Sequence, residues 1–343
     1  MSAPLLCVRD LEVSFRTEGG LLRAVDGVSF DLERGETLSI VGESGCGKSV
    51  TAMTLMGLTG GPNAQFSGSV KLDGQELLGA DDKVMRSVRG DRMSMVFQNP
   101  MTSLNPVHRI GNQIVEQIRA HRDVSKKEAM VRAVELLEAV GVPDAAERAR
   151  SYPHEFSGGM RQRAMIAMAL SLEPEILIAD EPTTALDVTI QAQIIELLKQ
   201  LNRDFGLTVI LITHDLGVVA DIADRVAVMY AGRLVEAGTL DEIFYDPRHP
   251  YSWGLLGSVP RIEGERLERL AQINGQPPSL IDPPEGCRFR ERCPHAFSKC
   301  GQEPELLSRG EAPGHLDRCW LEISGRPALR QLPSGLIGLG KPS

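Results

Sequence analysis

The sequence predicts an α/β fold that is built on a mainly parallel sheet with helices on both faces. Apolar runs at 37–41, 176–179 and 207–213 have the length of buried strands, and a stretch of helical spacing at 189–202 separates two of them. Strands that are apolar throughout need cover on both faces, which helices between parallel strands provide. A glycine-rich loop at 42–49 joins the first of these strands to a helix.

The composition is that of an ordinary globular chain. Its 343 residues are 42% hydrophobic and 24% charged, enough for a substantial core. The formal net charge of −9 argues against a general affinity for nucleic acid. No apolar run approaches the roughly 18 residues of a membrane span, and the first residues lack the basic and apolar regions of a signal peptide. We therefore expect a cytosolic chain without a nucleic-acid partner.

The N-terminal part predicts an antiparallel β subdomain. Residues 5–15 alternate as in a strand, two glycines turn the chain, and residues 24–30 have the pattern of an antiparallel partner. Further strands are predicted at 66–73 and 93–97.

A helical subdomain is predicted as an insertion into the sheet. Residues 107–150 have helical character, and Ser125 with Glu128 matches a capping box. The inserted block spans about 99–170, after which the alternation of strands and helices resumes and two strands within 226–236 close the sheet.

The composition of the chain changes after Pro250: prolines are frequent and would interrupt any long helix or strand. We expect a main domain at 1–258 and a small cysteine-rich C-terminal extension at 259–343. The extension is predicted to lack a large hydrophobic core, so another kind of interaction must stabilise it.

Residues 42–49 fit the pattern G-x-x-x-x-G-K-[ST], the phosphate-binding loop. The glycines allow backbone N–H groups to surround phosphate oxygens, and the following helix adds the positive end of its dipole. Lys48 is expected to reach the β- and γ-phosphates, and the Ser49 hydroxyl to bind Mg²⁺. The alternative is a glycine-rich turn that binds nothing. The predicted nucleotide contacts in this stretch are Gly42, Glu43, Ser44, Gly45, Cys46, Gly47, Lys48, Ser49 and Val50.

Two carboxylates end the apolar strand at 176–179. Asp180 beside the phosphate-binding loop could hold Mg²⁺, normally through water. Glu181, one residue further on, could activate the attacking water as a general base. The alternative is a pair of acids that merely caps a strand, but together with the phosphate-binding loop the pattern predicts hydrolysis of a nucleotide.

A second glycine-rich loop precedes another apolar helix. Ser157-Gly158-Gly159 at a helix start predicts a second group of backbone N–H donors that could bind an anion. One nucleotide needs only one such loop, so the second requires an explanation. In its context, the stretch from Phe156 to Gln162 resembles the signature loop of ATP-binding-cassette (ABC) ATPases. The residues that this resemblance assigns to the loop are Ser157, Gly158, Gly159, Met160 and Gln162.

The resemblance covers residues 5 to about 330 and implies a P-loop NTPase (RecA-like) fold that binds ATP and Mg²⁺. Gln98 matches the Q-loop glutamine, which would bind Mg²⁺ together with Ser49 and Asp180. Asp187 matches the D-loop aspartate.

Two further positions acquire a role from the resemblance. His214 matches the switch histidine that contacts the γ-phosphate, and without the resemblance it would be expected in the core. Phe15 matches the residue that stacks on adenine, with a core position as the alternative. Met160 stands where glutamine is usual, and Val50 where threonine or serine is common. The implied catalytic residues are Lys48, Glu181 and His214.

In this family two cassettes pair head to tail, which accounts for the second glycine-rich loop. Ser157 to Gly159 would serve the ATP of a partner cassette, so this chain by itself is expected to be a poor ATPase. ATP would hold the two cassettes together, and hydrolysis would release them.

The sequence is further similar to the ATP-binding subunits of oligopeptide and dipeptide importers, at 98–106, at 249–252 and in the tail. The similarity implies a second, different ABC ATPase subunit, two transmembrane permease subunits and an extracytoplasmic solute-binding protein. It places the chain peripherally on the cytoplasmic face of the membrane. Nickel, glutathione or a sugar are alternative solutes, and a soluble ABC ATPase that acts on nucleic acid or the ribosome is an alternative class.

Four cysteines lie close together in the tail, at a spacing of C-x5-C-x6-C-x18-C that fits neither the usual zinc ribbon nor the common ferredoxin runs. Four thiolates in a proline-rich segment suit a metal that organises it. In similar importer ATPases the matching cysteines hold a [4Fe-4S] cluster, with zinc as the alternative here. The predicted cluster ligands are Cys287, Cys293, Cys300 and Cys319.

Overall fold

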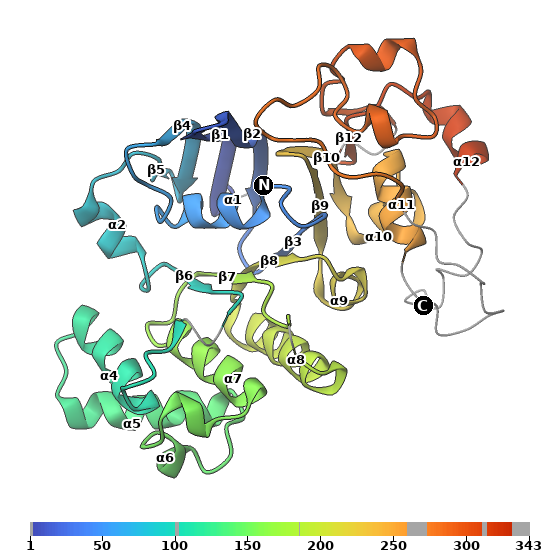
Figure 1. Cartoon of the computed structure of the whole chain (residues 1–343). Coiled ribbons are helices and arrows are strands. Elements are labelled where there is room, and N and C mark those ends of the chain that lie inside the picture. The colour runs from blue at the N-terminus through green and yellow to red at the C-terminus, as the bar shows by residue number, and fades with distance from the viewer. Residues whose placement is uncertain (1–2, 100–102, 185, 259–272, 311–313, 331–343) are drawn as a thin grey trace.

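The computed structural model describes residues 3–99, 103–184, 186–258, 273–310 and 314–330. They form two sheets (Figure 1). The larger sheet has the strand order β11 (Leu307–Ser308), β12 (Leu316–Asp317), β10 (Arg233–Thr239), β9 (Arg225–Tyr230), β3 (Thr37–Val41), β8 (Thr208–Thr213), β7 (Ile176–Asp180) and β6 (Met93–Val96). The smaller sheet has the order β2 (Gly20–Leu32), β1 (Leu6–Thr17), β4 (Ala64–Leu72) and β5 (Gln75–Glu76).

The centre of the larger sheet is parallel, as predicted. β3 lies between β8 and β9, and β7 and β6 follow on the far side of β8, all with parallel pairing. Every residue of β3, β7 and β8 is buried. Side chains of β7 alternate between two apolar clusters: Ile176 and Ile178 face the one, Leu177 and Ala179 the other. This double cover explains the uninterrupted apolar runs.

One face of the sheet is covered by the smaller antiparallel sheet and by helix α1 (Lys48–Leu55). β1 pairs with β2 and with β4 in antiparallel register, which confirms the predicted antiparallel subdomain. Because α1 starts directly after the glycine-rich loop, the packing of this face also fixes the place of the loop.

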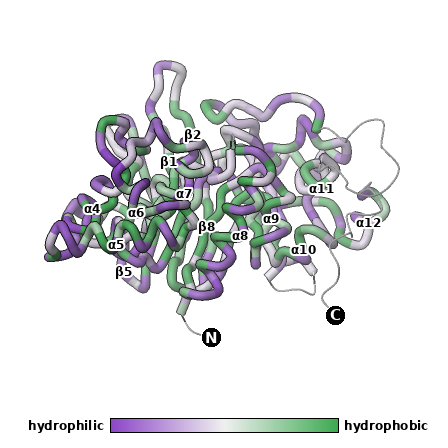
Figure 2. Tube along the Cα trace, turned by 90° about the horizontal axis from the view of Figure 1, so that it is seen from below, coloured by the Kyte–Doolittle hydropathy of each residue, from purple (hydrophilic) through white to green (hydrophobic). Residues whose placement is uncertain are grey.

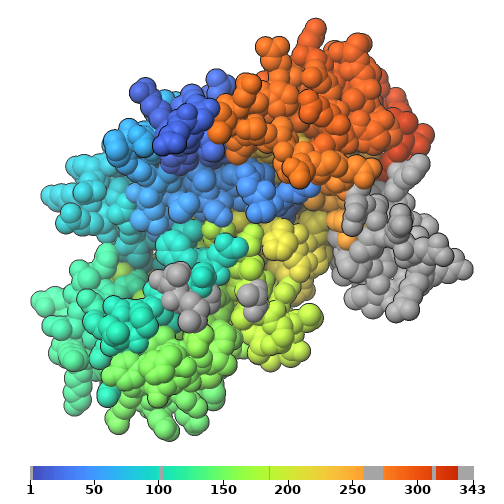
Figure 3. Space-filling model, viewed as in Figure 1, coloured from blue at the N-terminus to red at the C-terminus, as the bar shows by residue number. Residues whose placement is uncertain are grey.

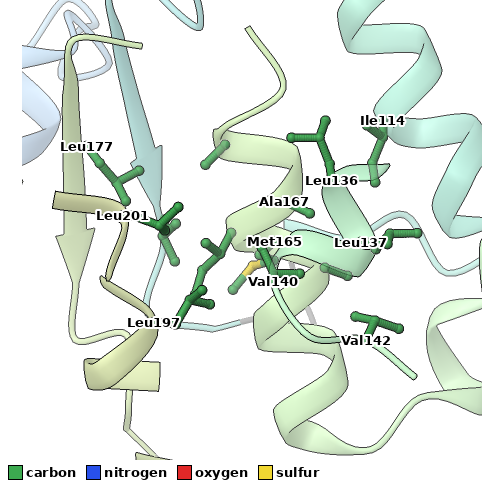
Figure 4. Close-up of a cluster of buried hydrophobic side chains, with 14 of the residues drawn as sticks. Ile114, Leu136, Leu137, Val140, Val142, Met165, Ala167, Leu177, Leu197 and Leu201 are labelled. Carbon is green, nitrogen blue, oxygen red and sulfur yellow. The ribbon is translucent and has the colours of Figure 1, made fainter. Parts of the chain in front are cut away.

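The other face carries the inserted helices. They are α4 (Ile110–His121), α5 (Lys126–Ala139), α6 (Ala145–Arg148), the 3₁₀ turn η1 (Pro153–Glu155) and α7 (Gly158–Ala169). The predicted capping box is present, since Ser125 accepts from the Glu128 N–H and the Glu128 carboxylate accepts from the Ser125 N–H. Figure 4 shows Leu137 and Met165 of this block in one cluster with Leu177 of the sheet.

The remaining helices are α2 (Asp82–Val88) before β6, α8 (Val188–Phe205) and α9 (Leu216–Ile222) around β8, and α10 (Leu240–Tyr245) and α11 (Pro250–Gly257) beyond β10. Figure 2 shows hydrophobic segments along β8 and more hydrophilic ones on the outer helices α4 and α5. Among the described residues, no helix is both long and apolar enough to cross a membrane.

Within 273–310 and 314–330, the described part of the C-terminal extension, all elements are short, as its prolines predict. They are the 3₁₀ turns η2 (Arg290–Arg292), η3 (Ser298–Gly301) and η4 (Ile323–Gly325) and the helix α12 (Arg326–Leu329), besides β11 and β12. β12 pairs with β10, so the strands at 226–236 do not close the sheet as predicted. Phe289 is buried in a cluster with residues of β9, β10 and α11. The extension therefore shares both sheet and core with the main domain, because β10 leaves a free edge that β12 can pair with.

Candidate functional site

The glycine-rich loop between β3 and α1 is closely packed against neighbouring backbone. Gly42 and Gly47 have φ angles of 156° and 108°. A Cβ on Gly42 would lie 2.1 Å from the Met229 carbonyl oxygen, and one on Gly47 would lie 2.2 Å from the Ala24 carbonyl oxygen. These glycines are therefore required by contact as well as by conformation.

Lys48 begins α1 and is buried inside the loop, with only 4% of its surface exposed. Its Nζ donates to the carbonyl oxygens of Gly42 at 2.7 Å and Glu43 at 3.0 Å. The ammonium group thus lies at the centre of the loop, where it can exchange these acceptors for phosphate oxygens.

Ser49 and Asp180 bring the two sequence motifs together. The Ser49 hydroxyl donates to Asp180 Oδ1 at 3.0 Å across the ends of α1 and β7. Burial raises the pKa of the Asp180 carboxyl, with a further contribution from the charge of Glu181. A buried carboxylate and a hydroxyl side by side are hard oxygen ligands that fit Mg²⁺, whose charge would compensate the cost of burying Asp180.

Glu181 is the centre of a second group of side chains. It has a positive φ of 47°, a conformation that a non-glycine residue keeps only when its surroundings hold it. Its Oε2 accepts from Gln98 Nε2 at 2.7 Å and from Thr184 Oγ1 at 2.9 Å, and its Oε1 lies 3.3 Å from His214 Nδ1. Burial would raise the pKa of Glu181, but the hydrogen bonds from Thr184 and His214 outweigh it and lower the pKa. The carboxylate is therefore ionised and positioned to accept a proton.

Gln98 lies beside the candidate general base. Its amide nitrogen donates to Glu181 Oε2 at 2.7 Å, whereas Asp180 is in contact with Ser49. The role of Gln98 as a ligand of Mg²⁺ stays a prediction.

The signature loop lies at the start of α7, within the inserted helices. Ser157 caps α7 by accepting from the Met160 N–H at 3.3 Å, and both Ser157 and Gly158 are exposed. Figure 1 shows α7 well separated from α1, so the loop lies apart from the phosphate-binding loop of the same chain. Asp187 caps α8 in the same way, through the Ile190 N–H at 3.0 Å. A Cβ on Gly159 would meet the Ile190 side chain at 2.8 Å, so the D-loop region packs on the signature loop.

Three other predicted contacts have less distinctive surroundings. Phe15 on β1 and Val50 on α1 are half-buried at the edge of one apolar cluster. Gln162 is buried, with 2% of its surface exposed, and its Nε2 has no hydrogen-bond partner in the described part of the chain. The role of Phe15 in stacking on adenine stays a prediction.

Two residues that hold the phosphate-binding loop were missed by sequence analysis. Tyr251 on α11 accepts a hydrogen bond from the Glu43 N–H at 2.8 Å, and Arg292 in the extension pairs with the Glu43 carboxylate at 2.6 and 2.9 Å. They lie 208 and 249 positions from Glu43. Tyr251 belongs to the stretch 249–252 singled out in the sequence, but nothing local to either residue indicates a contact with the loop.

The four tail cysteines are free thiols that line one narrow cavity of about 10 Å³, room for about one water. No group of three or more His, Cys, Asp or Glu side chains is arranged to hold a metal ion anywhere in the described ranges. The predicted metal cluster at these cysteines therefore has no support in the structure. Burial raises the pKa of Cys293 to about 11 and of Cys319 to about 12, so both are neutral thiols at pH 7.

The parallel sheet, the buried lysine in its glycine loop and the adjoining carboxylates define a P-loop nucleotide-binding protein. Comparison with known proteins refines this class. A sequence profile of the ABC transporter family matches residues 25–184, and one described as "Oligopeptide/dipeptide transporter, C-terminal region" matches residues 235–300.

Two curated relatives come from Bacillus subtilis (strain 168). An oligopeptide transport ATP-binding protein is 54% identical over 92% of this chain and 88% of its own length, and a dipeptide transport ATP-binding protein is 54% identical over 93% and 95%. The dimeric structure of a bacterial ABC transporter cassette matches with a TM-score of 0.62 and 28% identity, over 68% of this chain and 98% of that one. The chain belongs to the ABC transporter ATP-binding proteins, in the oligopeptide and dipeptide transport family.

Proposed function

We propose that this chain is the ATP-hydrolysing subunit of an importer that takes up dipeptides or oligopeptides. The observation that carries the proposal is the convergence of Lys48, Ser49, Asp180 and Glu181 at the ends of β3 and β7. The names of the two Bacillus relatives support the solute, and the match of the tail to the peptide-transporter C-terminal region supports it further.

The residues have separate tasks in the proposed hydrolysis. Lys48 and the loop N–H groups bind the phosphates, with Ser49 and Asp180 as ligands of Mg²⁺, which neutralises phosphate charge when bound. Glu181 accepts a proton from water as the water oxygen bonds to the γ-phosphorus and the bond to the bridging oxygen breaks. Gln98 and Thr184 hold the carboxylate of Glu181. His214, which contacts the same carboxylate, is proposed to donate to the γ-phosphate.

We further propose that the signature loop serves a second cassette. The separation of α7 from α1 and the exposure of Ser157 and Gly158 support an intermolecular role, as does the dimeric state of the similar cassette structure. The proposed assembly pairs this chain with a different ATPase subunit and adds two permease subunits and a solute-binding protein. It would hold the chain at the cytoplasmic face of the membrane, with the main domain at 1–258 and the extension at 259–343.

The cysteine cavity is proposed to hold a [4Fe-4S] cluster, with zinc as the alternative. The proposal rests on the resemblance of the four cysteines to those of similar importer ATPases, because the described side chains are not arranged as metal ligands. Loading requires that the thiols lose their protons and that the cavity widens. Anaerobically purified chain should contain about four iron and four sulfide per chain, and Cys293→Ser should lose them. Zinc alone, or no metal, would exclude the cluster.

The transport function is tested by deleting the gene for this chain. The deletion strain should fail to grow on peptides as a source of a required amino acid, and it should grow normally on the free amino acid. A plasmid with the wild-type chain should restore growth, and one with Glu181→Gln should not. Unchanged peptide uptake in the deletion strain would exclude a peptide importer, and a loss of nickel or sugar uptake would identify the solute.

A further inference from the structure

The C-terminal extension reaches the phosphate-binding loop through one arginine. Arg292 ends the 3₁₀ turn η2 and is 6% exposed at its side chain. Its Nη1 donates to Glu43 Oε2 at 2.6 Å and its Nη2 donates to Glu43 Oε1 at 2.9 Å, so the ion pair is bidentate. Such pairs fix orientation as well as distance, because the planar guanidinium matches the carboxylate.

The other donors of the guanidinium are also occupied. Nε donates to the Asn274 carbonyl at 2.9 Å, Nη2 to the Ile273 carbonyl at 3.3 Å, and Nη1 to the Tyr230 hydroxyl at 3.3 Å. With the two bonds to Glu43, all five N–H groups of Arg292 have an acceptor. A fully bonded and nearly buried side chain has little freedom, so it can hold Glu43 in one place.

Glu43 is held at each of its polar groups. Its N–H donates to the Tyr251 hydroxyl, its carbonyl oxygen accepts from Lys48, and its carboxylate pairs with Arg292. Tyr251 is fully buried and packs against Phe289 of the extension, with ring centroids 5.5 Å apart. Two of the three restraints on this loop residue therefore depend on the C-terminal end of the chain.

A second connection reaches the other end of the loop. The Cys46 carbonyl accepts from the Gly232 N–H at 2.9 Å, in the tight turn between β9 and β10. Arg288 of the extension donates to the carbonyl of Ala231 in that turn and also pairs with Asp26. Ala231 has a φ of 46°, a conformation that a non-glycine residue keeps only when its surroundings hold it. Figure 3 shows the extension lying against the N-terminal strands on this side of the molecule.

We infer that Arg292 is a positioning residue of the nucleotide site: its ion pair with Glu43 holds the phosphate-binding loop in the conformation that receives the triphosphate. The inference deepens the proposed function and rests on it. Removing the guanidinium would free the loop and leave the Glu43 carboxylate uncompensated next to the place of a polyanion. Both effects weaken ATP binding.

The coupling must act in both directions, because linkage between two sites is reciprocal. If Arg292 favours ATP binding through Glu43, bound ATP must stabilise the extension around η2. A merely structural arginine would lower stability without this link.

The test compares three full-length proteins: wild type, Arg292→Gln and Arg330→Gln. Arg330 is the matched control, since it joins the extension to Asp246 at 3.0 Å, away from the loop. ATP affinity is measured with a fluorescent ATP analogue well below the melting temperature of each variant. Arg292→Gln should bind about 5- to 30-fold more weakly, the loss expected for one charge-assisted pair, and Arg330→Gln within about two-fold of wild type.

Hydrogen exchange provides the second readout. ATP should slow amide exchange at 286–293 in wild type and in Arg330→Gln, and this protection should be absent from Arg292→Gln. Adding Glu43→Gln to Arg292→Gln should recover part of the affinity, because the uncompensated charge is gone.

The two proposals fail in different ways. If wild type does not bind ATP, the proposed function is wrong. If wild type binds ATP while Arg292→Gln binds within two-fold and exchange at 286–293 is unchanged by ATP, the positioning role is wrong and the ATPase function stands.

Discussion

The two glycine-rich loops of this chain offer the same kind of backbone donors, but the fold supports them differently. The phosphate-binding loop is packed against the sheet, with Gly42 and Gly47 against backbone carbonyls and Glu43 held by the extension. The signature loop is capped by its own Ser157, and it exposes Ser157 and Gly158 while Gly159 is buried against Ile190. Among the described residues, a Cβ on Gly158 would meet nothing closer than the Leu186 side chain at 3.6 Å, an ordinary contact. A loop that binds within its own chain can be built rigidly, whereas one that serves a partner must stay accessible.

The largest expected effect is the loss of ATP hydrolysis when Glu181, beside the phosphate-binding loop, is replaced. Glu181→Gln removes the carboxylate that accepts the proton and keeps the shape of the side chain. ATP hydrolysis in the assembled transporter should fall about 10²- to 10⁴-fold while ATP binding is retained. Turnover of radiolabelled ATP measures the first quantity and equilibrium binding the second. Hydrolysis at the wild-type rate would remove Glu181 as the base.

The next largest effect is the loss of stability when a Cβ is added to the tightly packed phosphate-binding loop, for comparison with the more open signature loop. Gly47→Ala forces a Cβ to within 2.2 Å of the Ala24 carbonyl, at a φ of 108°. We expect a loss of about 3 kcal/mol in the free energy of unfolding, together with a loss of ATP binding. Chemical denaturation measures the loss. Gly45→Ala is the control, since its φ is 78° but nothing lies within 4 Å, and it should cost only about 1 kcal/mol.

Gly158→Ala in the signature loop should lower ATP hydrolysis and leave the free energy of unfolding nearly unchanged. With room for the Cβ, the unfolding free energy should change by no more than about 0.5 kcal/mol. Hydrolysis by the assembled transporter should nevertheless fall, because the methyl group stands where the partner's ATP would approach. If the variant unfolds as easily as Gly47→Ala, the two loops do not differ in support.

The smallest effect concerns the buried carboxylate beside the first loop. The pKa of Asp180 is raised in the folded chain, so its ionised form costs stability once the pH exceeds the folded pKa. Asp180→Asn keeps an acceptor for Ser49 and removes this cost. Without Mg²⁺ at pH 7 we expect the variant to be more stable than wild type. The difference should shrink as the pH falls from the folded pKa towards about 4, and it should be lost below that pH, where Asp180 is protonated in both states. Thermal melts across this range would measure it, and a less stable variant at pH 7 would contradict it.

The catalytic half of the site can be predicted from sequence. Residues 42–49 and the strand ending at Asp180 specify a loop and two carboxylates, and in a parallel sheet the carboxyl ends of β3 and β7 meet at one edge. That is why Ser49 and Asp180 are found in contact. The antiparallel subdomain and the inserted helices were predicted for a similar reason, since hydrophobic periodicity and capping are local properties of the chain.

The contacts that support that site depend on the three-dimensional packing of the chain. The pairing of β12 with β10, the contact of Gln98 with Glu181 and the ion pair of Arg292 with Glu43 join residues far apart in sequence. None of them has a local pattern, because an arginine in a proline-rich tail has the same appearance whether it faces solvent or a phosphate-binding loop. The partner of Arg292 is set by the packing of Phe289, Tyr230 and Tyr251 in one buried cluster, which brings the extension against the loop.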